Sequence, residues 1–415
     1  MSAPGPLRIS WERLQGRLDA LGEIGSTGDG GCARLALTDA DKQGRDLVVS
    51  WMEDLGLRVD IDGIGNVVGT WPPDATEQPV MTGSHIDTVR TGGRYDGNLG
   101  VLAGLEAIET IITSGARPEH PLAVGFFTNE EGSRFAPDMF GSLVFVGGLP
   151  LEEALDVVAV DGAVAGDELE RIGYIGPMPC PARPPRAFVE LHIEQGPVLE
   201  AGGETIGVVT GVQGISWQEI TITGQSNHAG TTPMDHRHDP SFAAASITTF
   251  VRALATELGP PQVATVGRVE LHPNLVNVVP ARATLTVDLR NTDEDVLQHA
   301  EARLAAHCEE LAAAEGVTIE RKTLARFEPV AFDPEMVDRV ERVAVANGHR
   351  VRRMPSGAGH DAQMLARVCP TSMIFTPSIG GISHNPAERT HPADLEAGAN
   401  VLLDVLCELA GVVAP

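Results

Sequence analysis

The sequence contains few cysteines, and they form no recognisable pair. The five are widely spaced, odd in number and without a CxxC motif: Cys32, Cys180, Cys308, Cys369 and Cys407. This pattern argues against a disulfide framework and against a thiolate metal site. It is typical of free thiols in a reducing compartment, so we expect a cytoplasmic protein.

Positive charge is also scarce. Lys and Arg total 30 against 57 Asp and Glu, which gives a formal net charge of -27. A surface this acidic repels nucleic acid and anionic membranes, and we expect neither as a partner. A small anionic substrate would need a local positive centre, either a metal ion or a well-placed arginine.

Long hydrophobic runs are missing as well. No run of 18 apolar residues occurs, and Met1 to Ile9 has no basic start followed by an apolar core. The sequence therefore predicts neither a transmembrane helix nor a signal peptide. Hydrophobic residues nevertheless make up 42% of the 415 residues, which suits a packed protein of two or three domains.

Residues 79–108, PVMTGSHIDTVRTGGRYDGNLGVLAGLEAI, predict a strand, a loop and a helix. The loop carries His85, Asp87 and Asp96 among glycines, and apolar residues at helical spacing follow it. Ligands bind beyond the carboxyl ends of strands in an open α/β sheet, and His and Asp can ligate metals. We interpret the loop as half of a metal site, and an Asx-rich turn with an exposed histidine is the alternative.

Other segments offer further metal ligands. Glu130 and Glu131 follow an apolar strand, His192 lies in the strand AFVELHI, and His384 lies in the loop GGISHNPAE. Four such groups on successive elements of one sheet are unusual for surface turns, so we expect them to converge. Nitrogen and oxygen ligands without thiolate suit Zn, Mn, Co or Ni, and the set could hold two ions. Asp87 is placed to accept a hydrogen bond from a ligand imidazole.

The order of predicted elements changes in the middle of the chain. Residues 213–326 read as β-α-β-β-α-β, the split unit of ferredoxin-like domains. The elements on either side follow a parallel-sheet pattern. The predicted architecture is therefore α/β, with a mostly parallel-sheet catalytic domain formed by residues 1–212 and 327–415 and the smaller domain inserted into it.

Eight motifs carry a resemblance that covers almost the whole chain in order. They are GSHIDT (83–88), GGRYDGNLGVLAGLEAI (92–108), FTNEEGSRF (127–135), HIEQGPVLE (192–200), NHAGTTPMDHRHDP (227–240), NVVPARATLTVDLR (277–290), GAGHDA (357–362) and GISHNPAE (381–388). With them the chain resembles the metal-dependent amidohydrolases of the M20 peptidase family, and more narrowly their hydantoinase/carbamoylase branch. The HIEQG segment separates this branch from the peptidases, which usually have a carboxylate where His192 stands.

The resemblance implies a site with two divalent metal ions, zinc being favoured over manganese, cobalt and nickel. The implied ligands are His85, Asp96, Glu131, His192 and His384. Asp96 would bridge the ions and Glu130 would be the general base. Adjacent side chains cannot both reach one ion with good geometry, which supports different roles for Glu130 and Glu131. Asp87 would assist catalysis by orienting the ligand imidazole of His85.

The resemblance also implies roles for the inserted domain. His228 would stabilise the oxyanion of the transition state from a partner subunit, so a homodimer formed through this domain would be part of the mechanism. Asn277 and Arg290 would bind the substrate carboxylate, for which a planar guanidinium is well suited. A salt-bridged strand-end residue is the other interpretation of Arg290. Arg237 would brace the loop of His228.

Gln195 and His360 would line the substrate pocket, with Gln195 available to the terminal ureido amide. The implied reaction on this small anionic substrate is hydrolysis of an N-carbamoyl-L-amino acid to amino acid, ammonia and carbon dioxide. Allantoate and β-ureidopropionate remain open as substrates. The apolar run 136–140 favours carbamoyl amino acids. Other possible functions are an aminopeptidase or dipeptidase, and a binding protein without activity.

Overall fold

The computed structural model describes residues 7–413, which divide into two compact units. Unit 2 is Val212–Val330, and unit 1 contains the described residues on either side of it. The sequence placed the breaks at 212/213 and 326/327, close to these positions. The roles of unit 1 in catalysis and of unit 2 in dimerisation stay predictions.

A nine-stranded sheet runs through unit 1, in the order β1-β2-β4-β3-β5-β15-β6-β13 with β14 paired to β6. Its strands are β1 (Arg58–Ile61), β2 (Val67–Trp71), β3 (Val80–His85), β4 (Leu122–Phe127), β5 (Ala187–Ile193), β6 (Ile206–Val212), β13 (Val330–Ala331), β14 (Val351–Ser356) and β15 (Thr371–Thr376). The four central strands β4, β3, β5 and β15 are parallel, and β1, β2 and β6 pair antiparallel. The central strands are buried on both faces, as expected for parallel strands between helices.

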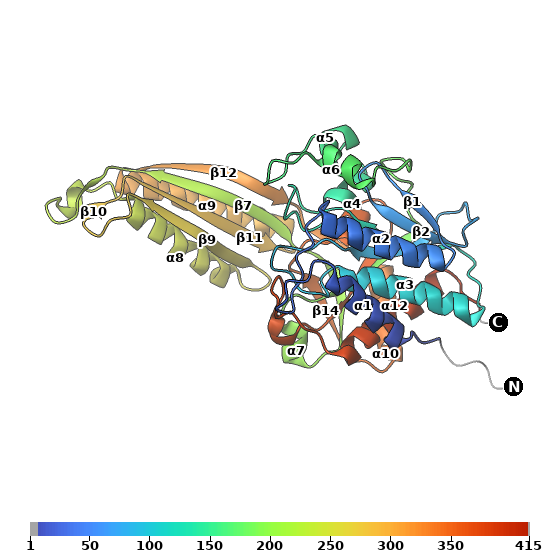
Figure 1. Ribbon diagram of the computed structural model, residues 1–415. Helices are drawn as coiled ribbons and strands as arrows, with labels where there is room; N and C mark the ends of the chain where they lie inside the picture. The colour runs from blue at the N-terminus through green and yellow to red at the C-terminus, as the bar shows by residue number, and fades with distance from the viewer. Residues whose placement is uncertain (1–6, 414–415) are drawn as a thin grey trace. The chain divides into compact units, whose positions relative to one another are not determined.

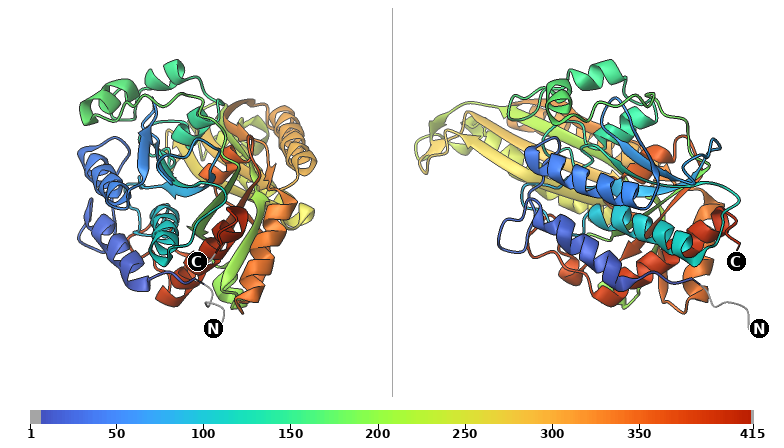
Figure 2. Two further views of the ribbon diagram at one scale, coloured as in Figure 1. Left: turned by 90° about the vertical axis from the view of Figure 1, so that its right-hand side faces the viewer. Right: turned by 45° about the vertical axis from the view of Figure 1, so that its right-hand side comes forward.

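Helices cover both faces of this sheet (Figures 1 and 2). They are α1 (Trp11–Glu23), α2 (Asp39–Asp54), α3 (Asn98–Ser114), α4 (Phe140–Phe145), α5 (Leu151–Leu155), α6 (Ala165–Ile172), α7 (Val198–Gly202), α10 (Pro334–Ala346), α11 (Asp361–Leu365) and α12 (Pro392–Leu409), with the short 3-10 turn η2 (Ile379–Gly381). Helices α3 and α12 pack together on the sheet face to which Leu191 points, and α4 and α11 pack on the other face. Helix α3 is almost entirely buried, because it lies between the sheet and the helices α1 and α12.

Unit 2 has the order β-α-β-β-α-β and a four-stranded antiparallel sheet, β12-β7-β11-β9. Its elements are β7 (Gly214–Thr223), β8 (Asn227–His228), η1 (Met234–His236), α8 (Pro240–Leu258), β9 (Val263–His272), β10 (Val278–Val279), β11 (Arg282–Asn291), α9 (Glu294–Glu315) and β12 (Thr318–Phe327). The core of the unit lies between this sheet and the helices α8 and α9. The short β8–β10 pair lies at one end of the long strands (Figure 1).

The sequence prediction of an α/β fold with a parallel sheet is confirmed for the centre of the sheet. The antiparallel strand β6, beside β15, was not predicted. It follows a short turn and has no motif to mark it, so only its pairing identifies it as a strand. All five cysteines are free thiols. Among the described residues, no helix combines the length and the apolar character that a membrane crossing requires.

The close packing of α3 against β5 leads to a testable prediction about the stability of a Gly100 variant. A Cβ atom there would overlap the main-chain oxygen of Leu191. Gly100→Ala should therefore lower the free energy of unfolding by about 1–3 kcal/mol through overpacking. Gly16, in α1, has no neighbour within 4 Å of a Cβ. Gly16→Ala is the matched control and should raise stability by about 0.5–1 kcal/mol in urea titrations. Equal effects of the two substitutions would contradict the packing argument.

Candidate metal centre

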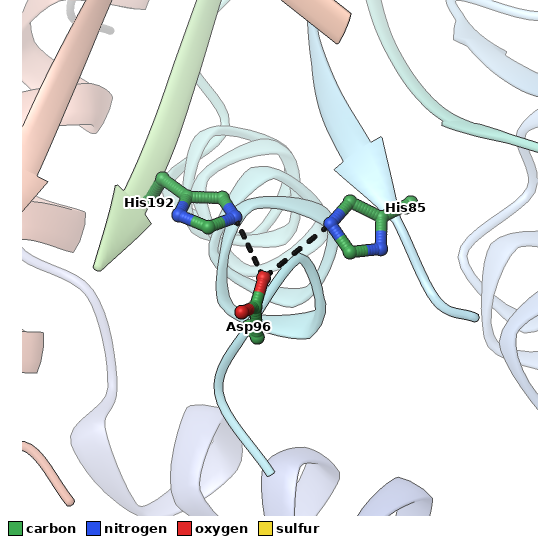
Figure 3. A group of neighbouring side chains, drawn as sticks. All are labelled: His85, Asp96 and His192. Carbon is green, nitrogen blue, oxygen red and sulfur yellow. Dashed lines mark ion pairs between the residues drawn. The ribbon is translucent and has the colours of Figure 1, made fainter. Parts of the chain in front are cut away.

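Two parallel strands bring histidines to one carboxylate. His85 is the last residue of β3 and His192 lies near the end of β5, and both point at Asp96 in the loop before α3 (Figure 3). The Nε2 atoms of His85 and His192 lie 3.5 and 3.2 Å from Asp96 Oδ1. All three side chains are buried. The carboxyl ends of neighbouring parallel strands thus assemble a compact group of one oxygen and two nitrogen atoms.

The tautomers of both imidazoles follow from their hydrogen bonds. His85 Nδ1 lies 2.9 Å from the main-chain oxygen of Asp87, and His192 Nδ1 lies 2.8 Å from that of Ile193. A carbonyl oxygen only accepts, so each Nδ1 carries the proton and donates it. In the neutral rings, each Nε2 therefore presents a lone pair toward Asp96. The main-chain N–H of Gly97 also points at His192 Nε2, 3.1 Å away.

A second group shares the same carboxylate. His384 Nε2 lies 3.5 Å from Asp96 Oδ2 and 3.2 Å from Glu131 Oε2. Asp96, Glu131 and His384 thus form a second potential metal group, with the His384 side chain 49% exposed. The five residues that the sequence predicted as ligands come together here, with Asp96 common to both groups.

These donor atoms fit divalent cations. Carboxylate oxygens face imidazole lone pairs at distances of 3.2–3.5 Å, and a cation between them turns repulsion into coordination. Glu131 Oε1 is buried, and no described residue gives it a hydrogen bond. A buried carboxylate oxygen without a partner is costly, and metal binding would satisfy it. The donor chemistry matches the nitrogen and oxygen set expected from the sequence.

Burial and charge shift the acid–base behaviour of the group strongly. Burial alone would raise the pKa of Asp96, but its contacts with His192, His384 and His85 hold that pKa well below its ordinary value. Burial raises the pKa of Glu130 well above its ordinary value, and the nearby carboxylate of Asp361 adds to the rise. Two carboxylates that lie 3.5 and 3.4 Å from the same His85 Nε2 atom thus differ sharply in proton affinity, as is common in active sites.

Glu130 lies beside the first group, with its Oε2 atom 3.4 Å from His85 Nε2. Asp87 acts on this glutamate pair differently from our expectation. The acceptor for the His85 imidazole is the main-chain oxygen of Asp87, whereas the sequence suggested its carboxylate. The Asp87 carboxylate instead accepts the main-chain N–H groups of Glu130 and Glu131 at 3.2 and 3.4 Å. Asp87 therefore links the loop of His85 to the glutamate pair.

Unusual backbone conformations gather around the centre. Asn129, Gln195 and His384 have φ angles of 55, 59 and 53°, in the left-handed region that non-glycine residues rarely adopt. Gly97 has φ 67°, and a Cβ atom there would also overlap the imidazole of His85. The glycine is therefore required both for the turn and for the space beside the ligand.

Gln195 contacts the shared carboxylate directly. Its Nε2 atom donates to Asp96 Oδ2 at 2.8 Å. Its Oε1 atom is buried, and no hydrogen bond reaches it from the described residues. One end of the side chain is thus fixed on Asp96 while the other end can accept a hydrogen bond from a ligand.

His360 lies behind the first group and does not complete a third metal site. Its ring centroid is 4.6 Å from that of His192, and its Nε2 atom lies 2.8 Å from Ser356 Oγ. Glu190 is also close to both histidines. However, the two Glu190 oxygens already accept hydrogen bonds from Ser84 Oγ and the main chain of Ala362. We therefore interpret His360 as packing against His192 rather than as a ligand.

Sequence reasoning missed Arg34, which is fully buried beside the centre. Its guanidinium donates to the main-chain oxygen of Ile86 and to Asn98 Oδ1, both at 2.8 Å. It also donates to the carbonyls of Leu21 and Ile24 at the end of α1. Arg34 thereby ties the loop of His85 to the start of α3. No sequence motif marks it, because most of its partners are main-chain atoms and its partner on α3, Asn98, lies 64 residues away.

Three predicted site residues, His228, Asn277 and Arg290, belong to unit 2, as does the predicted bracing residue Arg237. His228 is exposed, and its Nδ1 atom accepts the main-chain N–H groups of Gly230 and Thr231 at 3.0 and 3.1 Å. The neutral ring therefore carries its proton on Nε2. Asn277 belongs to the same hairpin end, since its main-chain oxygen accepts from Ala229. Arg237 donates to the carbonyls of Ala229 and Thr232, so it braces this loop as expected.

Arg290 lies at the other end of the sheet of unit 2. It pairs with Asp288 at 2.9 Å and lies over the ring of Trp217 at 5.9 Å. Residue 290 pairs with Ile215, whereas Arg282, near the hairpin end, pairs with Thr223. Eight residues of antiparallel strand span about 27 Å. Within one unit 2, Arg290 and the pair His228 and Asn277 are therefore far apart.

The apolar run 136–140 does not support the substrate argument that we drew from it. Met139 and Phe140 are buried at 1% and 0% exposure. Phe140 stacks on Phe135, and Met139 packs against Gly359. The two large apolar residues of this run are thus explained by the core of unit 1, and their apolar character gives no information about the substrate side chain.

Comparison with known proteins places these features in context. The profile of peptidase family M20/M25/M40 matches residues 81–408. The chain is 43% identical over 417 residues to the N-carbamoyl-L-amino-acid amidohydrolase of Rhizobium meliloti, with 100% of both chains covered. It is 38% identical over 408 residues to the allantoate amidohydrolase of Escherichia coli K12, with 96% of this chain and 98% of that protein covered.

Solved structures resemble the chain equally closely. A hydantoinase/carbamoylase family amidase from Burkholderia multivorans superposes with a TM-score of 0.93 at 47% identity, covering 97% of this chain and 98% of that one. A second one, from Burkholderia ambifaria, gives a TM-score of 0.92 at 42% identity over 99% and 100% of the two chains. Aminopeptidase PepT from Bacillus cereus shares only the fold, with a TM-score of 0.68 and 17% identity.

The donor set predicts that metal ions stabilise the protein. At a free Zn²⁺ concentration of 100 times Kd, binding to the folded state should add about 2.7 kcal/mol to the free energy of unfolding. Thermal unfolding of chelator-treated protein with added Zn²⁺ or Mn²⁺ would show the effect as a raised Tm. Mg²⁺ is the control, because it prefers all-oxygen ligands. Equal shifts with Mg²⁺, or an unchanged response in Asp96→Asn, would contradict the assignment.

Proposed function

This chain belongs to peptidase family M20/M25/M40, and on that basis we propose that it is a binuclear metal-dependent N-carbamoyl-L-amino acid hydrolase. The reaction consumes water and releases the L-amino acid, ammonia and carbon dioxide. The observation that carries the proposal is the sharing of buried Asp96 by two ligand groups beside Glu130. Full-length similarity to N-carbamoyl-L-amino-acid amidohydrolases supports the substrate.

Two divalent ions are assigned to the two groups around Asp96. His85 and His192 would hold one ion and Glu131 and His384 the other, with Asp96 between them. Bound there, the ions would lower the pKa of water and polarise the carbonyl of the substrate. Zinc is our first choice, and manganese, cobalt and nickel suit the same donor atoms.

Glu130 is assigned as the general base. Its carboxylate lies beside the metal group and is not needed as a ligand in either one. It takes a proton from the attacking water and passes it to the departing amine nitrogen. Asp87 holds the main chain of Glu130 in place through its carboxylate. Asn129, with its left-handed backbone, fixes the turn that directs Glu130 toward the centre.

His228 is assigned as the donor to the oxyanion that forms at the carbonyl. Its Nδ1 atom is occupied by two main-chain N–H groups, so Nε2 carries the proton and can donate it. A donor aimed at developing negative charge stabilises the transition state. The bracing of this loop by Arg237 keeps the imidazole in a fixed orientation.

Substrate recognition is divided between the units. Gln195 Oε1 would accept a hydrogen bond from the ureido amide, since its Nε2 atom is already fixed on Asp96. Arg290 would bind the carboxylate, which requires the substrate to share the guanidinium with Asp288. Asn277 would add an amide contact from the hairpin of His228.

A homodimer through unit 2 is part of this proposal. His228 and Arg290 lie at opposite ends of the sheet of unit 2, and the strand between Arg282, near the His228 end, and Arg290 spans about 27 Å. A substrate of amino-acid size cannot contact both in one copy. One active site would therefore combine the Arg290 of one chain with the His228 and Asn277 of its partner.

Allantoate is the second candidate substrate. The allantoate amidohydrolases of Escherichia coli and Bacillus subtilis are 38% and 35% identical to this chain. Allantoate also presents ureido groups and a carboxylate, so every residue assigned above would serve it equally. β-Ureidopropionate differs from the simplest N-carbamoyl amino acid, N-carbamoylglycine, by one additional methylene between the ureido group and the carboxylate, and the same residues would act on it. A dipeptide lacks the terminal ureido amide that Gln195 would bind.

The function is tested by a substrate panel with metal-loaded enzyme. We expect highest kcat/KM for N-carbamoyl-L-amino acids, lower values for allantoate, β-ureidopropionate and the D-enantiomers, and none for dipeptides. Ammonia release would be measured. Glu130→Gln should lower kcat by about 10²–10⁴-fold, because it removes the general base. Near wild-type activity of Glu130→Gln would refute the mechanism. A higher kcat/KM for allantoate or for a dipeptide would show that this compound, and not an N-carbamoyl-L-amino acid, is the substrate.

The shared site makes a separate prediction for mixed dimers. Glu130→Gln and His228→Ala chains should each be inactive alone. After subunit exchange, one site in each mixed dimer has both residues, so random mixing should restore about a quarter of wild-type activity. The measurement is ammonia release before and after exchange, with each variant exchanged against itself as the control. Failure to recover activity in verified mixed dimers would contradict the shared site.

A further inference from the structure

Glu388 contacts the candidate metal centre, and none of the roles described above involves it. It lies four residues after His384 on the same loop and is completely buried. Its Oε1 atom accepts the main-chain N–H groups of Tyr95 and Asp96 at 3.0 and 3.2 Å. A buried carboxylate is costly unless it is well hydrogen-bonded, so these contacts hold the loop of Asp96 firmly.

The second oxygen of Glu388 reaches the same aspartate through a hydroxyl group. Ser383 Oγ lies 3.0 Å from Glu388 Oε2 and 3.0 Å from Asp96 Oδ2. The single hydroxyl proton can serve one of these oxygens at a time. Thr91 adds a further connection, because its hydroxyl donates to the main-chain oxygen of His384. The loop of His384 is thus joined to the loop of Asp96 at several points.

Gly93 provides the space that Glu388 occupies. A Cβ atom at this position would overlap the Glu388 carboxylate. The φ angle of Gly93 is not in the left-handed region, so the glycine is needed for space and not for its conformation. A substitution at residue 93 would therefore displace the carboxylate without removing it.

A purely structural role would resemble that of Glu106, another completely buried glutamate. Glu106 accepts the main-chain N–H of Ser10 at 2.8 Å and pairs with Arg13 at 2.6 Å. Glu388 makes no salt bridge with a described residue, and its carboxylate stands beside that of Asp96. Two ionised carboxylates that share one hydroxyl group repel each other, and a cation on Asp96 would offset this repulsion. A cation bound to Asp96 would therefore stabilise this arrangement of Glu388.

We propose that Glu388 is a positioning residue for the second ligand group, formed by Asp96, Glu131 and His384. It fixes the main chain of Asp96 and joins it to the loop that carries His384. The first group depends less on Glu388, since His85 and His192 are held by the central strands β3 and β5. This inference rests on the proposed two-metal function.

The test is the affinity of each metal equivalent. Chelator-treated wild-type enzyme and variants would be titrated with Zn²⁺ against a chromophoric chelator. In Glu388→Ala we expect the first equivalent to keep its affinity and the second to bind at least about tenfold more weakly, as for other residues that orient metal ligands. Gly93→Ala should give the same result with the carboxylate present. Glu388→Gln should lose less than Glu388→Ala, because its amide oxygen can still accept both N–H groups.

Glu106→Ala is the matched control for burial. It should lower Tm and leave both metal affinities unchanged. Two unchanged equivalents in Glu388→Ala and Gly93→Ala would overturn the inference, and so would the same loss of affinity in Glu106→Ala. If wild-type enzyme itself binds fewer than two equivalents, the two-metal function fails. If wild type binds two and the variants match it, only the role of Glu388 fails.

Discussion

The centre depends on one electrostatic constraint, which is that Asp96 is faced by three imidazole nitrogens in a buried setting. Hydrogen bonds to main-chain carbonyls fix the Nε2 lone pairs of His85 and His192 on this carboxylate. Lone pairs and carboxylates so close together repel one another unless a proton or a metal cation lies between them. The parallel centre of the sheet makes this arrangement possible, because neighbouring parallel strands end at the same edge. The fold thus brings the carboxylates and imidazoles together, and this arrangement favours the binding of metal ions.

The sequence identified the five candidate ligands that the structure brings together, because each stands at a strand end or in a marked motif. Glu388 lies inside such a motif, yet its contacts with the loop of Asp96 could not be predicted, since they span nearly three hundred residues. Arg34 has no motif and mostly main-chain partners. The apolar run around Met139 was misinterpreted, because sequence does not distinguish an apolar pocket wall from core. The cytoplasmic location stays a prediction.

The inserted domain was predicted from the order of its elements, and the order alone does not assign its chemistry. The assignment that we propose draws on register, which puts Arg290 and His228 at opposite ends of the sheet. It also comes from the two N–H groups on His228 Nδ1, which leave Nε2 as a donor. Both features support a site completed by a second chain, since a small substrate needs its carboxylate and its carbonyl oxygen bound at once.

Three glycines near the centre show why a sequence motif underdetermines its own physical reason. Gly97 needs a left-handed backbone and also leaves room for His85. Gly93 leaves room for Glu388, and Gly100 lets α3 approach the main chain of β5. Gly93 and Gly97 appear in the sequence as part of one glycine-rich loop, for which a turn is the natural interpretation, and Gly100 lies in the first turn of α3. In the structure, two of the three are required by a neighbour that is distant in sequence. Glycines beside a ligand therefore deserve to be tested as space for a specific side chain before they are attributed to a turn.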